Sequence, residues 1–281
     1  MKMTLVLTSQ NRTEELRRFV CSLNNQKDID FSQLQLIFVD QGNNEFVFEN
    51  LNCLIKLDCI KSGQCSLSHA RNIALPHVEG KYVCFPDDDC WYESDTLSRV
   101  YSILDQERYQ IVSGKGLNEK GLPTSVFPKE NSVISSTHRC AAISYTLFFK
   151  FVPDVFFDEN MGVGSKYNIG AGEETDYLLT LIEKKNYNAY YDTNIIVHHP
   201  IQEDTYDKPY LLKKFYSYSR GGGYLMQKHN FTFMYKIKQL GRPLVGSIFF
   251  FLTGNIFRSQ KSFFMFKGKL EGLFFKIPSD T

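Results

Sequence analysis

The segment Tyr82-Val83-Cys84-Phe85-Pro86-Asp87-Asp88-Asp89, in the first third of this 281-residue chain, is an apolar run that stops at a proline and three carboxylates. Such a run is typical of a buried strand whose carboxyl end carries a polar site. In an extended backbone Asp87 and Asp89 point to one side and Asp88 to the other. Three neighbouring acids raise one another's pKa unless a cation compensates their charge, which predicts a bound Mg²⁺ or Mn²⁺. The alternative is an N-cap cluster for the next helix, which needs only one Asp.

Short apolar runs alternate with amphipathic stretches on both sides of this segment, which predicts an α/β fold. Polar residues gather where the expected strands end, and open α/β sheets bind ligands at that edge. A further helix is expected after Pro209, up to three consecutive glycines at 221–223. The expected strands are 5–8, 34–39, 54–57, 82–85, 111–113, 140–149, 187–191 and 195–198, and the other expected helices are 14–24, 66–75, 93–106 and 172–185.

The charge of the chain is divided unevenly between its parts. The net charge is +1, yet residues 211–277 hold twelve Lys and Arg against one acid, which leaves 20 basic and 30 acidic residues elsewhere. The same segment is rich in Phe, and basic residues among apolar ones favour binding to an anionic membrane surface. Its apolar stretch 244–257 is too short to span a bilayer. The alternative is a helix packed on the rest of the chain with its basic face in solvent. Clustered Phe side chains argue against nucleic acid, which prefers spaced aromatic residues.

The cysteines and the N-terminus indicate a reducing, cytoplasmic environment. Seven cysteines form no Cys-x-x-Cys pair and no regular spacing, which argues against a disulfide framework and a structural zinc site. The apolar run after Met1 meets Gln10 at once, so it is too short for a signal peptide and predicts a first strand. The chain also lacks the glycine-rich motifs of P-loop and dinucleotide-binding proteins.

Five motifs, in order, resemble those of the inverting family 2 glycosyltransferases of GT-A fold, over roughly residues 3–200. The first motif lacks the Pro and Tyr of the family pattern, and the last has Glu where the family has Asp. The segment 157–164 ahead of the last motif is similar to bacterial transferases that build capsule, lipopolysaccharide or exopolysaccharide. The motifs are Thr8-Ser9-Gln10-Asn11-Arg12, Val39-Asp40-Gln41-Gly42-Asn43, Ala70-Arg71-Asn72, Phe85-Pro86-Asp87-Asp88-Asp89 and Gly172-Glu173-Glu174.

This resemblance implies a GT-A fold, which is a Rossmann-like nucleotide-binding mixed sheet flanked by helices. A helical, basic and aromatic C-terminal extension would follow it. We expect a catalytic domain at residues 1–205, made of a donor-binding half at 1–113 and an acceptor half at 114–205. The membrane-associating extension is expected at residues 206–281.

The resemblance also implies an inverting, metal-dependent transfer of a sugar from a nucleotide-sugar, a UDP-sugar at family level, to an acceptor hydroxyl. A lipid-linked oligosaccharide acceptor in bacterial surface polysaccharide synthesis would explain the extension, and it would place the chain on the inner face of the cytoplasmic membrane. The extension would otherwise join two copies in a homodimer. The alternatives are a nucleotidyltransferase, which shares metal-binding acids on a nucleotide-binding sheet, and a non-catalytic scaffold that binds sugar nucleotides or membrane.

The expected catalytic base is Glu174, because inversion needs one carboxylate to take the proton of the acceptor hydroxyl. Glu173 and Asp176 are its alternatives, as base, acceptor contact or lid, and acids in a first helical turn also stabilise a helix. Trp91 is expected either to stack on a sugar at the acceptor site or to pack in the core.

The remaining expected site residues follow the matched motifs. Asp89 is the main metal ligand, and Asp87 shares the metal or holds the ribose. One of the pair His198 and His199 is expected to make a third contact, to the metal or to the diphosphate. The other donor-binding residues are Ser9, Asn11 and Arg12, Asp40 for the base N–H, Arg71 for the base or the diphosphate, and Asp88 for ribose or backbone donors.

Overall fold

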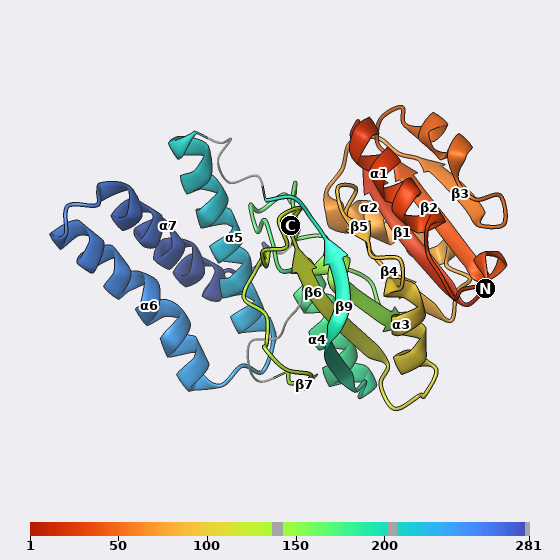
Figure 1. The fold of residues 1–281 in the computed structure, drawn as a ribbon. Helices are drawn as coiled ribbons and strands as arrows, with labels where there is room; N and C mark the ends of the chain where they lie inside the picture. Colours follow the sequence, from red (N-terminus) through yellow and green to blue (C-terminus); the bar gives the residue numbers. More distant parts are fainter. Residues whose placement is uncertain (137–142, 202–206, 279–281) are drawn as a thin grey trace.

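A computed structural model describes residues 1–136, 143–201 and 207–278, and this described part is built around one mixed sheet (Figure 1). Its strand order is β3-β2-β1-β4-β8-β6-β9-β5, and β7 pairs with β9. β3, β2, β1 and β4 are parallel, whereas β8 runs antiparallel to both of its neighbours, β4 and β6. The strands are β1 Met3–Ser9, β2 Leu34–Asp40, β3 Lys56–Lys61, β4 Tyr82–Cys84, β5 Trp91–Tyr92, β6 Ile111–Leu117, β7 Ser132–Ile134, β8 Leu147–Lys150 and β9 Ala189–His198.

Helices cover both faces of the sheet, which explains why the central strands are buried on both sides. α1 and α3 pack on the face to which Leu5 and Leu36 point. α2 and α4 pack on the opposite face, against Val6 and Ile37. The helices are α1 Thr13–Asn24, α2 Leu67–Ala74, α3 Thr96–Leu104, α4 Glu173–Lys185, α5 Lys208–Lys228, α6 Phe233–Leu252 and α7 Ile256–Leu273.

The expected α/β fold is confirmed, and four of the expected strands are corrected. The strand expected at 54–57 is β3, which begins later and continues to Lys61, because its half-buried polar residues gave no apolar signal. The strands expected at 187–191 and 195–198 are one strand, β9, whose pairing with β6 shifts register between Ser113 and Lys115. Of the strand expected at 140–149, residues 140–142 lie outside the described residues, and β8 begins only at Leu147.

The glycines at 221–223, expected to end a helix, lie inside α5 and allow α7 to approach it closely. A Cβ built at Gly223 would lie 2.2 Å from the carbonyl oxygen of Lys269 in α7. A Cβ at Gly272 in α7 would lie 2.1 Å from the carbonyl oxygen of Arg220 in α5. Side chains at these positions would separate the two helices, so the glycines set the distance between them.

α6 and α7 form a helical hairpin that lies beyond α5, away from the sheet (Figure 1). Among the described residues, no helix is both long and apolar enough to cross a membrane. Many large apolar side chains of the hairpin are nevertheless exposed, and we call them the hairpin surface. On α6 they are Phe233, Met234, Ile237, Leu244, Val245, Ile248, Phe249, Phe251 and Leu252, and on α7 they are Ile256, Phe263 and Leu270.

Candidate functional site

The three carboxylates that follow β4 lie beside the residues that follow β1, because parallel neighbours end at the same edge of the sheet. Ser9 donates its hydroxyl hydrogen to Asp88 at 2.6 Å. The guanidinium of Arg12 donates to Asp88 at 3.2 Å and to Asp89 at 2.6 Å. Ser9 and Arg12 are therefore in direct contact with the acids Asp88 and Asp89.

His199 completes a cluster with two of the acids. Its Nε2 lies 2.9 Å from Asp89 and 3.9 Å from Asp87. Together the three offer ligand atoms that all lie within 4.8 Å of one another. The Nδ1 of His199 is 2.7 Å from the carbonyl oxygen of Pro200, which can only accept, so Nδ1 carries the hydrogen and Nε2 faces the acids. Two carboxylates and an imidazole Nε2 are a donor set that fits a divalent cation.

The electrostatics of the cluster differ from one acid to the next. Burial raises the pKa of Asp88 to about 6, against the opposing effect of Ser9 and Arg12. Burial also raises the pKa of Asp87, although Arg71 and His199 oppose it. For Asp89 the burial effect is outweighed by His199 and Arg12, so its pKa lies below the ordinary value. Asp89 is therefore the acid most firmly held in the ionised form that a metal ligand needs.

Of the pair His198 and His199, it is His199 that lies in this cluster, while His198 and Trp91 pack against each other outside it. The His198 ring stacks on Trp91 at 5.1 Å, and its Nε2 lies 2.6 Å from Glu93. Arg18 covers the Trp91 ring at 4.0 Å. The cause is the pairing of β5 with β9, which sets Trp91 opposite His198. Because side chains alternate along a strand, His199 then points toward the acids.

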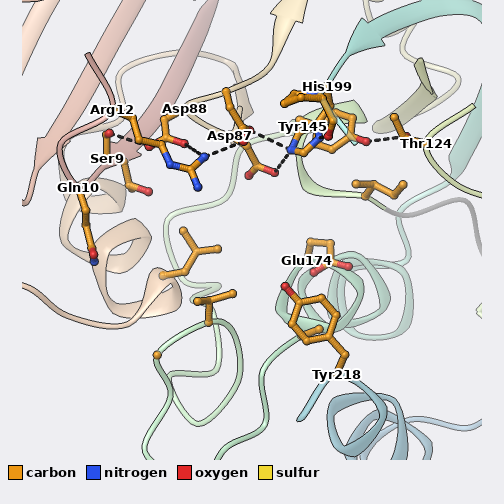
Figure 2. A pocket seen from close by; sticks show the side chains of 18 of the residues that line it. Ser9, Gln10, Arg12, Asp87, Asp88, Thr124, Tyr145, Glu174, His199 and Tyr218 are labelled. Carbon is orange, nitrogen blue, oxygen red and sulfur yellow. Dashed lines mark hydrogen bonds and ion pairs between the residues drawn. The ribbon is translucent and has the colours of Figure 1, made fainter. Parts of the chain in front are cut away.

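A cavity of about 900 Å³ opens beside the acids, and Glu174 lines it (Figure 2). Figure 2 shows Glu174 next to the ring of Tyr218, across open space from Arg12 and Asp87. Burial, together with the negative charge of Glu173, raises the pKa of Glu174 to about 8. Glu174, a carboxylate with a perturbed pKa, thus lies across the cavity from the candidate metal ligands Asp87 and His199.

The two alternatives to Glu174 point elsewhere. Glu173 is buried and accepts from Arg71 at 3.2 Å. Asp176 is buried on the other side of α4, where it lies 2.8 Å from His229 and 2.9 Å from Lys228. Neither residue lines the cavity.

Arg71 and Asp40 are placed differently from what the motifs implied. Arg71 is 1% exposed and donates to Asp87 at 3.3 Å and to Ser144 at 2.5 Å, so it lies beneath the acids. The carboxylate of Asp40 is fully buried and accepts from Lys61 and from the backbone and side chain of Asn44. Burial acts to raise the pKa of Asp40, but these donors outweigh it and lower the pKa.

Neither Asp40 nor Asn11 lines the cavity, whereas their neighbours Gln41 and Gln10 do. Asn11 has a positive φ of 67° and accepts from the backbone N–H of Asn43. It therefore shapes the turn after β1 and leaves its neighbours to face the cavity.

Four cavity residues gave no sequence signal. Tyr145 stacks on His199 at 4.6 Å, and its hydroxyl lies 2.7 Å from that of Thr124. Lys214 and Tyr218 line the cavity from α5, in a segment whose composition favoured a membrane surface or a packed helix with its basic face in solvent. Their spacing of four residues places them on one helix face, but it equally fits a buried or solvated face.

The sequence is similar to those of known glycosyltransferases over about half of its length. The sequence model of glycosyl transferase family 2 matches residues 4–170. The poly(ribitol-phosphate) beta-N-acetylglucosaminyltransferase TarS of Staphylococcus aureus is 23% identical over 156 residues, which are 52% of this chain and 26% of that protein. The poly(ribitol-phosphate) beta-glucosyltransferase of Bacillus spizizenii is 26% identical over 141 residues, 47% of this chain and 22% of that protein. The matched segment thus spans about a quarter of the length of these relatives.

Solved structures agree in fold over nearly the whole chain. Residues 1–349 of S. aureus TarS, in a complex with UDP-GlcNAc, match with a TM-score of 0.55 and 13% identity, over 98% of this chain and 93% of that one. A mannosyltransferase of Pyrobaculum calidifontis, in complex with GDP-Man and Mn²⁺, matches with a TM-score of 0.64 and 11% identity, over 97% of this chain and 87% of that one. The expected GT-A fold is confirmed. Since the family model covers more than half of the chain, this protein belongs to glycosyl transferase family 2.

Proposed function

We propose that this chain is an inverting, metal-dependent glycosyltransferase that moves a sugar from a UDP-sugar to an acceptor hydroxyl. One observation carries the proposal: a single cavity has Asp87, Asp89 and His199 on one side and Glu174 on the other. Transfer with inversion needs both parts, because the leaving diphosphate requires positive charge while the acceptor hydroxyl requires a base. The relatives with UDP-GlcNAc and with glucosyl- or acetylglucosaminyl-transferase names support a UDP-sugar donor.

Glu174 is the base in this mechanism. Its carboxylate would accept the proton of the acceptor hydroxyl while that oxygen attacks the anomeric carbon from the face opposite the leaving diphosphate. The raised pKa of Glu174 makes it a stronger base than an ordinary carboxylate, at the cost of being ionised in only part of the molecules near neutral pH.

The acids and His199 would hold the metal, which when bound supplies positive charge for the departing diphosphate. Asp89 and Asp87 provide oxygen ligands, and the Nε2 of His199 provides a nitrogen. An imidazole in the set favours Mn²⁺ over Mg²⁺, since Mg²⁺ prefers oxygen ligands alone. Arg12, held by Asp88 and Asp89, adds a second cation on the donor side.

The first test measures binding and turnover of a panel of nucleotide sugars with and without Mn²⁺. We expect one donor to bind only with the metal. Asp89→Ala should abolish that binding, and Glu174→Gln should bind the donor without turning it over. Glu183→Gln, a change to another acid of α4 that does not line the cavity, is the matched control for Glu174→Gln. If no donor binds, or if both site variants behave like the wild type, the chain is a scaffold and the proposal is wrong.

We further propose that the acceptor is lipid-linked and that the hairpin surface binds the anionic inner face of the cytoplasmic membrane. Exposed apolar side chains such as Leu252 (78%) and Phe251 (65%) lie within a segment that carries twelve basic residues against one acid. Apolar burial and attraction to anionic headgroups add in such a segment.

Vesicle co-sedimentation tests this membrane contact. The full chain should sediment with vesicles that contain phosphatidylglycerol and much less with pure phosphatidylcholine. Replacement of Phe249, Phe251 and Leu252 together by Ser should abolish sedimentation. Val133→Ser, at a similarly exposed apolar residue on β7, should leave it unchanged. Unchanged sedimentation of the triple variant would contradict the membrane contact.

A further inference from the structure

Helix α5 contributes to the cavity although it lies beyond residues 4–170, which the family model matches. Tyr218 and Lys214, one helical turn apart, both line the cavity. Figure 2 shows the Tyr218 ring beside Glu174, on the side away from Ser9 and Arg12. The Lys214 ammonium lies 5.5 Å from the centre of that ring.

The position of α5 relative to Glu174 is fixed by close packing. A Cβ built at Gly221 of α5 would lie 1.9 Å from the carbonyl oxygen of Ala171, which directly precedes the first turn of α4. At the C-terminal end of α5, Lys228 donates to Asp176 of α4 at 2.9 Å. The helix that carries Tyr218 therefore contacts α4, or the residues just before it, at two places C-terminal to Tyr218.

Tyr218 and Lys214 supply two kinds of chemistry at this place. An aromatic ring can pack on the apolar face of a sugar ring, and 42% of Tyr218 is exposed for such a contact. A lysine ammonium is a point charge that suits phosphate. The Tyr218 ring lies beside Glu174, the Lys214 ammonium lies 5.5 Å from the centre of that ring, and the base acts on the acceptor.

The donor side of the cavity has its own positive charges. Arg12 pairs with Asp88 and Asp89, and His199 lies against Asp89. The diphosphate of a donor belongs with that group, because the proposed metal site is there. The Lys214 ammonium lies 5.5 Å from the centre of the Tyr218 ring, which Figure 2 shows beside Glu174.

We propose that α5 forms an acceptor subsite, in which Tyr218 packs on the acceptor sugar and Lys214 binds a phosphate group attached to it. The acceptor is accordingly a phosphorylated saccharide, either a phosphate ester or a sugar linked through diphosphate to a lipid. This inference rests on the proposed transferase function and specifies its acceptor.

The test uses the full chain saturated with UDP and Mn²⁺, so that the donor side is filled. Glucose 1-phosphate, glucose and glucose linked through diphosphate to a short prenyl chain are titrated by calorimetry and saturation-transfer NMR. We expect both phosphorylated probes to bind more tightly than glucose, and the tighter of the two identifies the source of the phosphate. Lys214→Ala should weaken the phosphorylated probes roughly tenfold or more, to the level of glucose.

Four further variants separate a subsite from a general loss of charge or fold. Lys214→Arg should keep most of the affinity. Lys213→Ala, at the exposed neighbour on α5, should change nothing. Tyr218→Ala should weaken the binding of glucose and of both phosphorylated probes equally, whereas Tyr218→Phe should leave their binding unchanged.

A failure of the acceptor subsite can be distinguished from a failure of the transferase proposal. If UDP binds neither the wild type nor any variant, the transferase function itself is wrong. If UDP binds but Lys214→Ala weakens UDP, Lys214 belongs to the donor diphosphate and the subsite is refuted. Equal affinity for glucose and glucose 1-phosphate, no binding of any probe, or an equal loss in Lys213→Ala would also refute it.

Discussion

The raised pKa of Glu174 makes the proposed transferase strongly dependent on pH. Burial and the charge of Glu173 place that pKa at about 8, and a base acts only in its ionised form. About a tenth of the Glu174 carboxyls are then ionised at pH 7, about half at pH 8 and about nine-tenths at pH 9. The rate under limiting acceptor should therefore rise nearly tenfold from pH 6 to pH 7 and level off above pH 9.

The assay is UDP release from the donor identified above, measured from pH 6 to pH 9.5 with saturating donor and Mn²⁺. Glu174→Gln should lower the rate by roughly 10²–10⁴-fold and remove the pH dependence. Glu173→Gln removes the neighbouring negative charge and keeps the base, so its midpoint should move to lower pH. A wild-type profile that is already level at pH 6, or a Glu173→Gln midpoint that moves upward, would refute this account of the base.

The same shift has a consequence for stability. A carboxyl whose pKa is raised on folding makes the folded state less stable as pH increases from its ordinary value of 4.5 to about 8. One pKa unit corresponds to about 1.4 kcal/mol, and a carboxyl that lines a cavity is partly screened by water. Glu174→Gln should therefore increase the free energy of unfolding by roughly 1–3 kcal/mol at pH 9 and leave it unchanged near pH 4. Urea unfolding at both values checks this, and equal stability at pH 9 would contradict it.

Further predictions concern the parts that support the site. Arg71→Met should lower the free energy of unfolding by roughly 3–5 kcal/mol in urea, because it leaves buried carboxylates without their cation. His199→Ala should weaken Mn²⁺ binding in calorimetry by at least the roughly 10–100-fold typical of lost supporting contacts; unchanged affinity would exclude it as a ligand. Gly223→Leu should lower the melting temperature through a clash with α7, whereas Gly222→Ala, which meets open space, should not. Burial acts to lower the pKa of His229, but Asp176 and Glu183 outweigh it and raise that pKa. His229 should therefore stabilise the folded state at low pH, and this stabilisation should be lost as pH rises through its pKa in the folded state. His229→Gln should flatten this part of the pH–stability curve.

Much of the fold followed from local patterns in the sequence. The apolar strand before Asp87 and the amphipathic helices around it were sufficient for the α/β class, because their periods reflect burial on one or two faces. Elements with polar character were harder to predict. β3 and the middle of β9 bury few apolar side chains, and only their pairing with neighbouring strands defines their limits.

The sequence by itself therefore determined the α/β class, the cluster of acids at the carboxyl end of β4 and the helix that begins with acidic residues. The tertiary structure decided which side chains meet. The pairing of β5 with β9 turns His199 toward Asp89 and His198 away, and the packing of α4 directs Glu174 into the cavity. Tyr218 lines the cavity because α5 packs closely against the start of α4 and against α7. A repeat of two or 3.6 residues fixes which residues share a face, but the side to which that face turns is set only by contacts between residues far apart in the chain.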